Sequence, residues 1–531
     1  MAGQGLNSIQ EDVMPTLQPE SHAVLDPVFF EDESTPPVSV QGSSTPRTAS
    51  QSSTDDPGTY HVIKLSSIED VMPRAYIRIC FVYHLPEEKL LYPAIDNLRA
   101  FVRQTIDAKP YLAGYVTDIE TTGNRARRSE LRFSMHDFLN YPLVETKVLR
   151  DDDGKLLSYA ELDEQRFPPS RIRPEIVSAL QENVGPEDRS APVFRVQANI
   201  LQGGLIISFY LHHCVSDGTG FDLLTTGDLM HDSYSFNRNM ATEHLMVVAL
   251  EDRLKLFAAQ MTAIRYRLSE ASPNQINTRQ LQARRRDQIP PFPQSKPGRG
   301  CIINISWHKV ESAYLSFTSN ATTTKHTRQS ILMALLWRHM TRARRPSISE
   351  SLDVKTSRLF VPVDIRQRLK EPLSPAYFGS AVDSATARLD LDALTETGGK
   401  SLEEISEIIR EAIDRVDDSY VRECIAFANS ADALTDVSDI QASNMNRSTG
   451  ADMYITSWLR LRSYKCDLGM GLGGPSWVRK PWSRDPGSCI IMPLKDPSPD
   501  CYEAVIQMTE VDMERLLNDG EFMDFVLGVV D

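Results

Sequence analysis

Two apolar runs separated by a double glycine stand out in the first half of the sequence. The runs are residues 194–201 and 205–213, and Gln202-Gly203-Gly204 separates them. Both runs are rich in β-branched and aromatic residues, which favour strands. Glycine readily adopts the positive φ angles that a tight hairpin needs. The pattern therefore predicts a hairpin of two apolar strands.

Strand-type and helix-type segments alternate around this hairpin. Residues 75–85 form an aromatic and β-branched run, and the following segment repeats apolar residues at helical spacing: Ile95, Leu98, Phe101, Val102 and Ile106. Further on, residues 330–345 form an apolar stripe that ends in arginines. Residues 401–404 form a capping-box signature that opens another apolar helix face. The alternation predicts an α/β fold.

Two stretches differ in composition from the rest of the chain. Residues 1–58 are rich in Ser, Thr, Pro, Gln and acidic residues. They bury too little apolar surface to offset the entropy of ordering, so we expect a disordered segment. Residues 271–305 include a polar, basic and proline-rich run with Arg284-Arg285-Arg286. We expect a crossover linker between two halves there.

Charge and cysteine usage exclude several classes of function. The formal net charge is −15, which repels nucleic-acid phosphates and anionic lipid, so neither is expected as a partner. The seven cysteines are scattered without a CxxC pair, which indicates reduced thiols in an intracellular protein. No secretory signal is visible, and no apolar run reaches the ~18 residues that a membrane span needs. We therefore expect a cytoplasmic protein without a metal site.

The chemistry is concentrated at the end of the hairpin, in residues 211–220 (LHHCVSDGTG). Strand alternation places His212 on one face and His213 on the other, which it shares with Leu205, Ile207, Phe209 and Leu211. The chain then turns, and Thr219 with Asp222 is expected to cap a helix. His213 would thus lie at a strand-to-helix junction, where a scaffold can hold a general base.

The residues around His213 are open to other interpretations. A histidine that ends an apolar strand is also consistent with a buried side chain satisfied by backbone groups. Cys214 points to the opposite face from His213, and Ser216 lies too close to it in the chain to form a triad. No GxSxG elbow or HExxH pattern is present, and two adjacent histidines cannot chelate a metal from one strand face. A general base and a buried histidine remain.

His213, Asp217 and Gly218 match HxxxDG, and residues 467–471 (DLGMG) are similar to DFGWG, with Leu468 and Met470 in place of Phe and Trp. These motifs resemble those of CoA-dependent acyltransferases of the BAHD type, in particular the fungal trichothecene 3-O-acetyltransferase-like kind. Residues 456–458 (TSW), 361–366 (VPVDIR) and 377–379 (YFG) resemble further family motifs, although Ser380 stands where the family usually has Asn. Their order and spacing match the family from about Tyr60 to the end of the sequence.

The resemblance implies a fold of two chloramphenicol-acetyltransferase-like domains, each a mixed sheet with flanking helices, with a channel between them. The HxxxDG domain would span residues 59–270 and the DFGWG-like domain residues 306–531, on either side of the crossover at 271–305. His213 would be the general base at the middle of the channel. Asp217 would pair with Arg366 as structural support, and the Thr456 hydroxyl and Trp458 indole N–H would stabilise the oxyanion. Structural roles are implied for Gly218, Asp467, Gly469 and Gly471.

The expected activity is O-acylation by acyl-CoA, most simply O-acetylation by acetyl-CoA, of a hydroxyl on a small secondary metabolite such as a terpenoid or polyketide. A thioester is already activated, so a base and an oxyanion site suffice and no bound cofactor is expected. The apolar face of the His213 strand is expected to be a wall for an apolar acceptor. We further expect a monomer.

Two points remain open in the sequence. The residues that contact CoA are not identified: Arg342, Arg344 and Arg345 suit either its phosphates or a solvated helix end. A condensation-domain-like enzyme that uses carrier-bound thioesters and a non-catalytic binding relative are alternatives. The block at residues 467–479 argues against the first, and the intact His213, Asp217, Gly218 and Arg366 argue against the second.

Overall fold

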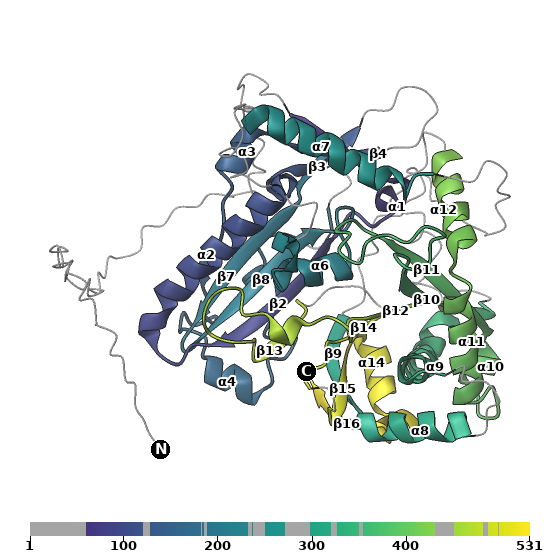
Figure 1. Ribbon diagram of the computed structural model, residues 1–531. Coiled ribbons are helices and arrows are strands. Elements are labelled where there is room, and N and C mark those ends of the chain that lie inside the picture. Colours follow the sequence, from purple (N-terminus) through teal and green to yellow (C-terminus); the bar gives the residue numbers. More distant parts are fainter. Residues whose placement is uncertain are drawn as a thin grey trace, which may run out of the picture. The chain divides into compact units, whose positions relative to one another are not determined.

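The computed structural model describes residues 60–119, 128–181, 183–184, 188–231, 236, 250–270, 298–319, 326–349, 354–430, 451–481, 487–496 and 499–531 (Figure 1). They lie in one compact unit, Pro57–Asp531. The segment 1–58 and residues 271–297 of the expected crossover lie outside the described residues, whereas residues 298–305 belong to a strand, β9 (Gly298–Ser306).

Two sheets contain the strands of the amino-terminal half, which we take as the chain before β9. The predicted hairpin forms β7 and β8 of a five-stranded sheet of order β13-β2-β8-β7-β5, whose strands are Trp477–Arg479, Tyr76–His84, Gly204–His212, Phe194–Leu201 and Glu145–Val148. A four-stranded sheet of order β1-β4-β3-β6 contains His61–Lys64, Arg128–Phe133, Tyr115–Ile119 and Ser190–Pro192. In the hairpin, Gly203 has a φ of 77°, whereas Gly204 is needed because a Cβ there would lie 2.5 Å from Tyr159 Cδ2. Only one of the two glycines therefore supplies a positive φ.

One seven-stranded sheet organises the carboxy-terminal half, from β9 onward. Its order is β11-β10-β12-β14-β15-β9-β16, with strands Val382–Asp390, Thr356–Asp364, Met453–Ser457, Ser488–Ile491, Cys501–Thr509, Gly298–Ser306 and Val526–Val530. β12 is parallel to β10 and β14, and the other pairs are antiparallel. The sheet is therefore mixed, as expected.

Helices pack against these sheets where the apolar spacing predicted them. α2 (Leu91–Ala108) buries Ile95, Leu98, Val102 and Ile106. α9 (Arg328–Ser349) contacts α8 (Trp307–Ser319), α10 (Leu391–Thr395), α11 (Leu402–Asp414) and α14 (Glu510–Leu517). α11 begins at the predicted capping box, in which the Glu404 N–H donates to Ser401 Oγ at 3.2 Å. The remaining described helices are α1 (Ser67–Asp70), α3 (Met135–Leu139), α4 (Tyr159–Glu164), α5 (Pro174–Val177), α6 (Gly218–Thr225), α7 (Leu250–Tyr266), α12 (Asp418–Ser430) and α15 (Gly520–Met523).

A strand of the carboxy-terminal half joins the five-stranded sheet. β13 pairs antiparallel with β2 and lies beside it in Figure 1. Its last residue, Arg479, is 1 % exposed and donates to the carbonyls of Arg166 at 2.8 Å and Phe167 at 3.2 Å. The same guanidinium pairs with Glu503 of β15 at 3.0 Å. Backbone bonds and one buried cation thus tie the two halves together.

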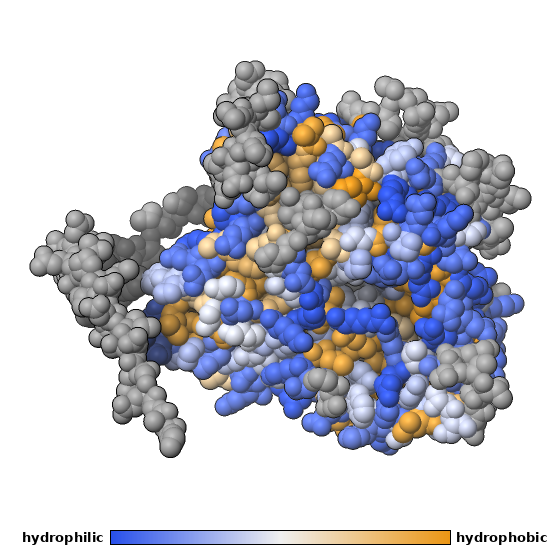
Figure 2. Space-filling view, in the orientation of Figure 1, coloured by the Kyte–Doolittle hydropathy of each residue, from blue (hydrophilic) through white to orange (hydrophobic). Residues whose placement is uncertain are grey.

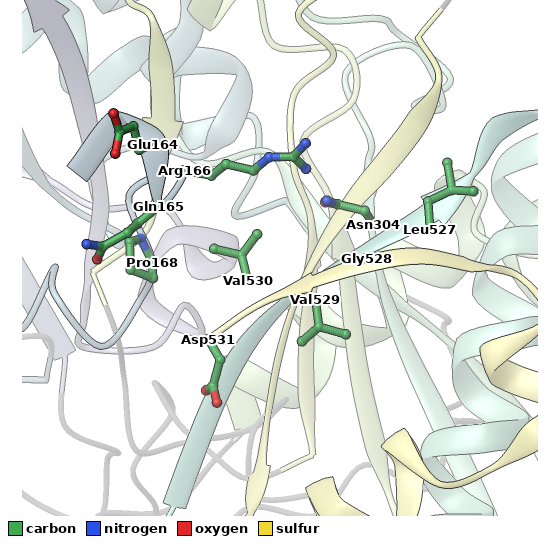
Figure 3. Close-up of a pocket in the computed structure, with 10 residues that line it drawn as sticks. All are labelled: Glu164, Gln165, Arg166, Pro168, Asn304, Leu527, Gly528, Val529, Val530 and Asp531. Atoms are coloured by element: carbon green, nitrogen blue, oxygen red, sulfur yellow. The ribbon is translucent and has the colours of Figure 1, made fainter. Parts of the chain in front are cut away.

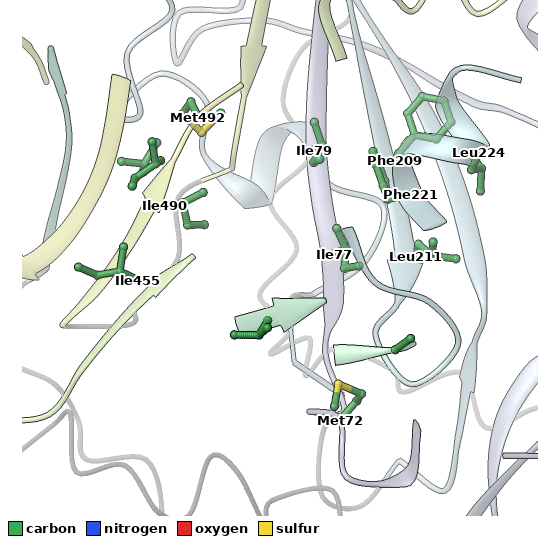
Figure 4. Packing of buried hydrophobic residues seen from close by; sticks show 14 of the residues in the cluster. Met72, Ile77, Ile79, Phe209, Leu211, Phe221, Leu224, Ile455, Ile490 and Met492 are labelled. Atoms are coloured by element: carbon green, nitrogen blue, oxygen red, sulfur yellow. The ribbon is translucent and has the colours of Figure 1, made fainter. Parts of the chain in front are cut away.

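The apolar core includes residues from both halves. Figure 4 shows members of one cluster from β2, β8 and α6 together with Ile455, Ile490 and Met492 of the carboxy-terminal half. Leu205, Ile207, Phe209 and Leu211 are each 0 % exposed. The Phe209 ring packs against the rings of Phe81, Phe194 and Phe221. The expectation that this strand face forms a wall for the acceptor is therefore wrong, because the face is core.

The surface differs from this core in character. Figure 2 shows a face with many hydrophilic residues and scattered apolar patches. Among the residues that the structure describes, no helix combines the length and the apolarity that a bilayer crossing requires.

Candidate active site

The HxxxDG segment forms a tight turn between β8 and α6. The His213 N–H donates to Ala75 O at 2.8 Å, and the Val215 N–H donates back to His212 O at 2.9 Å. Asp217 is the N-cap of α6, because its Oδ1 accepts from the Gly220 N–H at 3.0 Å. The expected cap by Thr219 and Asp222 is therefore wrong. Thr219 Oγ1 instead donates to Asp364 Oδ2 at 3.0 Å.

The two adjacent histidines have different environments. His212 is 0 % exposed, and its Nδ1 accepts from the Cys214 N–H at 3.2 Å. Burial lowers the pKa of His212 to about 3, so this ring stays neutral. His213 remains partly exposed. Its Nδ1 is buried without a hydrogen-bond partner, whereas its Nε2 is not buried. Nε2 of His213 is therefore the nitrogen that keeps access to its surroundings.

Burial keeps the His213 ring neutral at pH 7. Burial lowers the pKa of His213, while its own backbone carbonyl and the Asp217 carboxylate act in the opposite direction. The net shift is downward. A neutral imidazole with an accessible Nε2 can accept a proton from a hydroxyl.

Asp217 and Arg366 form the buried ion pair that the resemblance implied. Arg366 Nη1 lies 2.8 Å from Asp217 Oδ2, Nη2 lies 2.9 Å from Oδ1, and the two side chains are 2 % and 1 % exposed. The carboxylate also accepts from the backbone N–H groups of Gly220 at 3.0 Å and Ala381 at 2.8 Å. Desolvation alone would raise the pKa of Asp217, but Arg366 and these N–H groups hold it below its usual value. Both carboxylate oxygens are thus occupied, which supports a structural role.

Residues 377–381 of the carboxy-terminal half line this turn. Ser216 Oγ donates to Phe378 O at 2.6 Å, and Ser380 Oγ donates to His213 O at 2.6 Å. Arg366 Nη2 donates to the carbonyls of Tyr377 at 3.0 Å and Gly379 at 2.9 Å. Ser380, visible in the sequence only as a departure from the family pattern, therefore contacts the histidine that the motif singled out.

A second buried ion pair adjoins this segment and was missed from the sequence. Glu69 is 0 % exposed, and its Oε1 accepts from Arg265 Nε at 3.1 Å and from the Tyr377 hydroxyl at 3.3 Å. Ser66-x-x-Glu69 is a capping-box signature, and the box is present. That signature predicts a helix start, but it carries no sign that the carboxylate is buried against an arginine almost 200 residues away.

Thr456 and Trp458 lie at the end of β12. Both are half-buried, and in the described part of the chain neither Thr456 Oγ1 nor Trp458 Nε1 has a hydrogen-bond partner. A few residues on, Arg462 N–H donates to Asp222 Oδ1 of α6 at 2.6 Å, and Nε donates to Oδ2 at 2.8 Å. The chain that follows the TSW motif is thus docked on the helix that follows the HxxxD motif. Both candidate oxyanion donors remain available to a ligand.

The DFGWG-like block is a loop organised by its aspartate. Asp467 Oδ1 accepts from the Gly473 N–H at 2.9 Å, and Oδ2 accepts from the Gly471 N–H at 3.3 Å. Leu468, Gly469 and Gly471 have φ values of 54°, 71° and 74°. Leu468 and Met470 are 2 % and 4 % exposed and belong to the core. The two substitutions therefore keep the apolar contacts, and the geometry supports a structural role for Asp467.

The arginines of α9 are committed to protein groups. Arg342 Nη1 lies 2.8 Å from Glu521 Oε2 and 3.3 Å from Asp519 Oδ2, and Arg345 pairs with Asp392 and Glu396. Arg344 is 4 % exposed and donates to Asp452 O at 3.0 Å. Arg344 therefore does not lie at a solvated helix end, whereas Arg342 and Arg345 stay partly exposed in surface ion pairs. His339, Asp519 and Glu521 could together hold a metal ion, but Arg342 already neutralises both carboxylates.

A separate pocket of about 490 Å³ opens beside β9 (Figure 3). It is lined by Glu164, Gln165, Arg166 and Pro168, by Asn304 of β9 and by residues 527–531. Figure 3 shows the Arg166 side chain extending toward Asn304, with the carboxylates of Glu164 and Asp531 at the margin. None of the sequence-predicted site residues lines this pocket.

Comparison with known proteins accounts for these motifs. The model of the Transferase family matches residues 165–523, and that of the trichothecene 3-O-acetyltransferase-like N-terminal domain matches residues 75–226. Acyltransferase easC of Emericella nidulans is 25% identical over 470 residues, which cover 87% of this chain and 94% of that protein. Trichothecene 8-O-acetyltransferase of Fusarium sporotrichioides is 25% identical over 498 residues, covering 87% of this chain and 97% of that protein.

Solved structures share the fold. TRI101 of F. sporotrichioides, in complex with coenzyme A and T-2, superimposes with a TM-score of 0.69 at 19% identity, covering 88% of this chain and 100% of that one. Vinorine synthase gives a TM-score of 0.53 at 15% identity, covering 88% and 97%. These similarities confirm the predicted chloramphenicol-acetyltransferase-like fold class. Because the family model spans about two thirds of the sequence, the chain belongs to the Transferase family and is an acyltransferase of the trichothecene 3-O-acetyltransferase-like, BAHD type.

Proposed function

We propose that the protein transfers a short acyl group, most simply acetyl, from CoA to a hydroxyl of a small secondary metabolite of terpenoid or polyketide type, with His213 as the general base. The observation that carries the proposal is the contrast at the end of β8: His213 is partly exposed at Nε2, whereas the His212 ring is fully buried and the Asp217 carboxylate is occupied by Arg366 and backbone N–H groups. Relatives named for O-acetylation of trichothecenes and eremophilanes support the reaction and the acceptor class. The complex of TRI101 with coenzyme A supports the donor.

The proposed reaction needs one base and one oxyanion site. His213 Nε2 takes the proton of the acceptor hydroxyl as its oxygen attacks the thioester carbonyl carbon. Thr456 Oγ1 and Trp458 Nε1 donate to the tetrahedral oxyanion, a contribution of roughly 3–4 kcal/mol for a good donor. The intermediate then collapses, the C–S bond breaks, and the CoA thiolate receives the proton from His213. Asp217 takes no proton and holds the turn.

The setting of this site is part of the proposal. The two halves would be domains, the first at residues 59–270 and the second beginning with β9 at Gly298 rather than at residue 306, with donor and acceptor meeting in a channel between them. The separation of the sheets supports this division, since all seven strands of the large sheet come from β9 onward. A cytoplasmic monomer without a bound cofactor or metal fits the composition, as argued above.

The test is a pair of alanine variants assayed with acetyl-CoA and a panel of terpenoid and polyketide alcohols. His213→Ala should lower kcat by about 10²–10⁴-fold with an unchanged Tm, since a general base contributes that much. His212→Ala is the matched control: its ring is 0 % exposed, so the loss should appear mainly in Tm. If His213→Ala keeps most of its kcat, the mechanism is wrong.

The same assay separates the alternatives. A condensation-domain-like enzyme would release no thiol from free acetyl-CoA and would need a carrier-bound thioester. A binding relative would retain the alcohol without consuming either donor. Mass spectrometry of the product identifies the transferred group, and a gain larger than acetyl would overturn the donor assignment.

A further inference from the structure

The His213 ring has no side chain that orients it. Its Nδ1 is buried without a hydrogen-bond partner, and the carboxylate of the HxxxDG motif, Asp217, is occupied by Arg366 and two backbone N–H groups. The position of the ring therefore depends on the main chain of His213 itself. That main chain is held on both sides: its N–H donates to Ala75 O at 2.8 Å, and its carbonyl accepts from Ser380 Oγ at 2.6 Å.

Ser380 is itself rigidly placed. It is 0 % exposed, and each neighbour in the chain is bonded to the Asp217–Arg366 pair. The Gly379 carbonyl accepts from Arg366 Nη2 at 2.9 Å, and the Ala381 N–H donates to Asp217 Oδ2 at 2.8 Å. A Cβ on Gly379 would lie 2.2 Å from the Tyr377 hydroxyl oxygen, so this segment has little freedom to move. The hydroxyl is thus presented to His213 from a fixed backbone.

We propose that Ser380 is a positioning residue for His213, whose hydroxyl fixes the carbonyl of the histidine from the carboxy-terminal half and thereby aims Nε2 at the acceptor. The inference rests on the proposed role of His213 as base. Holding the His213–Cys214 peptide plane sets the direction of the Cα–Cβ bond, and with it the place of the ring. A misplacement of about 1 Å at a reacting group can cost on the order of 10²-fold in rate.

The structure supplies a matched control for this role. Ser216 is also 0 % exposed, and its hydroxyl also donates to a backbone carbonyl of the other half, Phe378 O, at 2.6 Å. Both hydrogen bonds join the turn before α6 to residues 377–381, but Ser216 donates from the turn and Ser380 donates to it. Only the bond from Ser380 ends on the peptide of His213.

The experiment compares Ser380→Ala, Ser216→Ala and two variants that keep a donor, Ser380→Thr and Ser380→Asn, in the full chain. Both alanine variants should lower Tm by similar amounts. Ser380→Ala should lower kcat by about 10- to 100-fold without changing KM for acetyl-CoA or the alcohol. Ser216→Ala should leave kcat unchanged, and at least one donor variant of Ser380 should recover most of it. Equal kcat values for Ser380→Ala and Ser216→Ala would show a merely structural role and overturn the proposal.

A double variant separates this inference from the proposed function. In His213→Ala, adding Ser380→Ala should leave the residual rate unchanged, because Ser380 acts through the histidine. A further loss of the same size as in the wild-type background would overturn the inference alone. An active His213→Ala would overturn the proposed function, whatever Ser380 does. An inactive His213→Ala beside a fully active Ser380→Ala would overturn only the positioning role.

Discussion

The proposed base, His213, has no carboxylate hydrogen-bonded to its ring. Burial lowers its pKa, and the Asp217 carboxylate, which acts the other way, is occupied by Arg366. The ring is therefore neutral at physiological pH, and its accessible nitrogen needs no further activation toward an acceptor that meets an already activated thioester.

This electrostatic balance makes a pH prediction. A base whose pKa lies below its ordinary value of about 6.5 stays deprotonated at lower pH, so the acid limb of kcat/KM should have its midpoint below about 6.5. His212, with a pKa of about 3, should not contribute in this range. The measurement is kcat/KM for the alcohol between pH 4.5 and pH 8, roughly, with Tm followed at each pH. A midpoint above 6.5 in protein that stays folded would contradict the lowered pKa of His213.

The local sequence predicted that His212 and His213 lie on opposite strand faces, but it did not predict the tertiary contacts around them. Alternation assigned His212 to the face opposite His213, and its ring lies edge-on to Tyr76 on the neighbouring strand. It did not identify the cap of α6, because Asp217 and Thr219 both have capping chemistry and only the backbone geometry decides between them. The partner of Asp222 is Arg462, 240 residues away, and no local sequence pattern predicts such a contact.

At the scale of elements, the turn before α6 and residues 377–381 behave as one unit. The Asp217–Arg366 pair, the two seryl hydroxyls and the Ala381 N–H join them in both directions. Removal of one partner of a buried pair leaves an uncompensated charge.

Loss of this ion pair should therefore appear first as loss of stability. Asp217→Ala and Arg366→Met should each cost about 3–5 kcal/mol of unfolding free energy, and the double variant should cost less than their sum. Urea denaturation followed by circular dichroism measures all three. An Asp217→Ala protein with unchanged stability and no activity would instead give Asp217 a direct catalytic role.

The glycines of the two motifs should respond differently to alanine. Gly469 and Gly471 have φ values of 71° and 74°, so Gly469→Ala and Gly471→Ala should each cost about 1–2 kcal/mol. Gly218 is the control, because its φ is not positive and a Cβ there would meet no atom within 4 Å. Gly218→Ala should leave the unfolding free energy nearly unchanged. If Gly218→Ala lowered the unfolding free energy more than Gly469→Ala and Gly471→Ala, Gly218 would have to make a close packing contact, which contradicts the open space around it.

Elements with strong periodicity were predictable, and short or context-dependent ones were not. β2, β7, β8, α2 and α11 follow from apolar spacing, turn glycines and a capping box. β13 has only three residues and pairs with a strand from the other end of the chain, so its position depends on tertiary contacts. α9 continues past its arginines through Pro346 to Ser349, although cations at this place in the sequence suited a helix end.

At the scale of the whole molecule, many basic side chains are committed to internal contacts. Arg366 and Arg479 are buried against Asp217 and Glu503, and Arg342 and Arg345 of α9 face carboxylates. The chain as a whole carries a formal net charge of −15. An anionic donor such as acyl-CoA therefore approaches a protein of the same sign.

This charge predicts how the rate depends on salt. Raising ionic strength from about 0.01 M to about 0.15 M shortens the Debye length from about 30 Å to about 8 Å and screens long-range repulsion. With a net charge of −15, kcat/KM for acetyl-CoA should rise over this range, while kcat/KM for an uncharged alcohol, measured at saturating acetyl-CoA, should stay constant. Sodium chloride and potassium acetate should give the same curve, because screening depends on ionic strength rather than on the ion. A kcat/KM for acetyl-CoA that falls with salt would show that a local basic surface at the donor entrance outweighs the net charge.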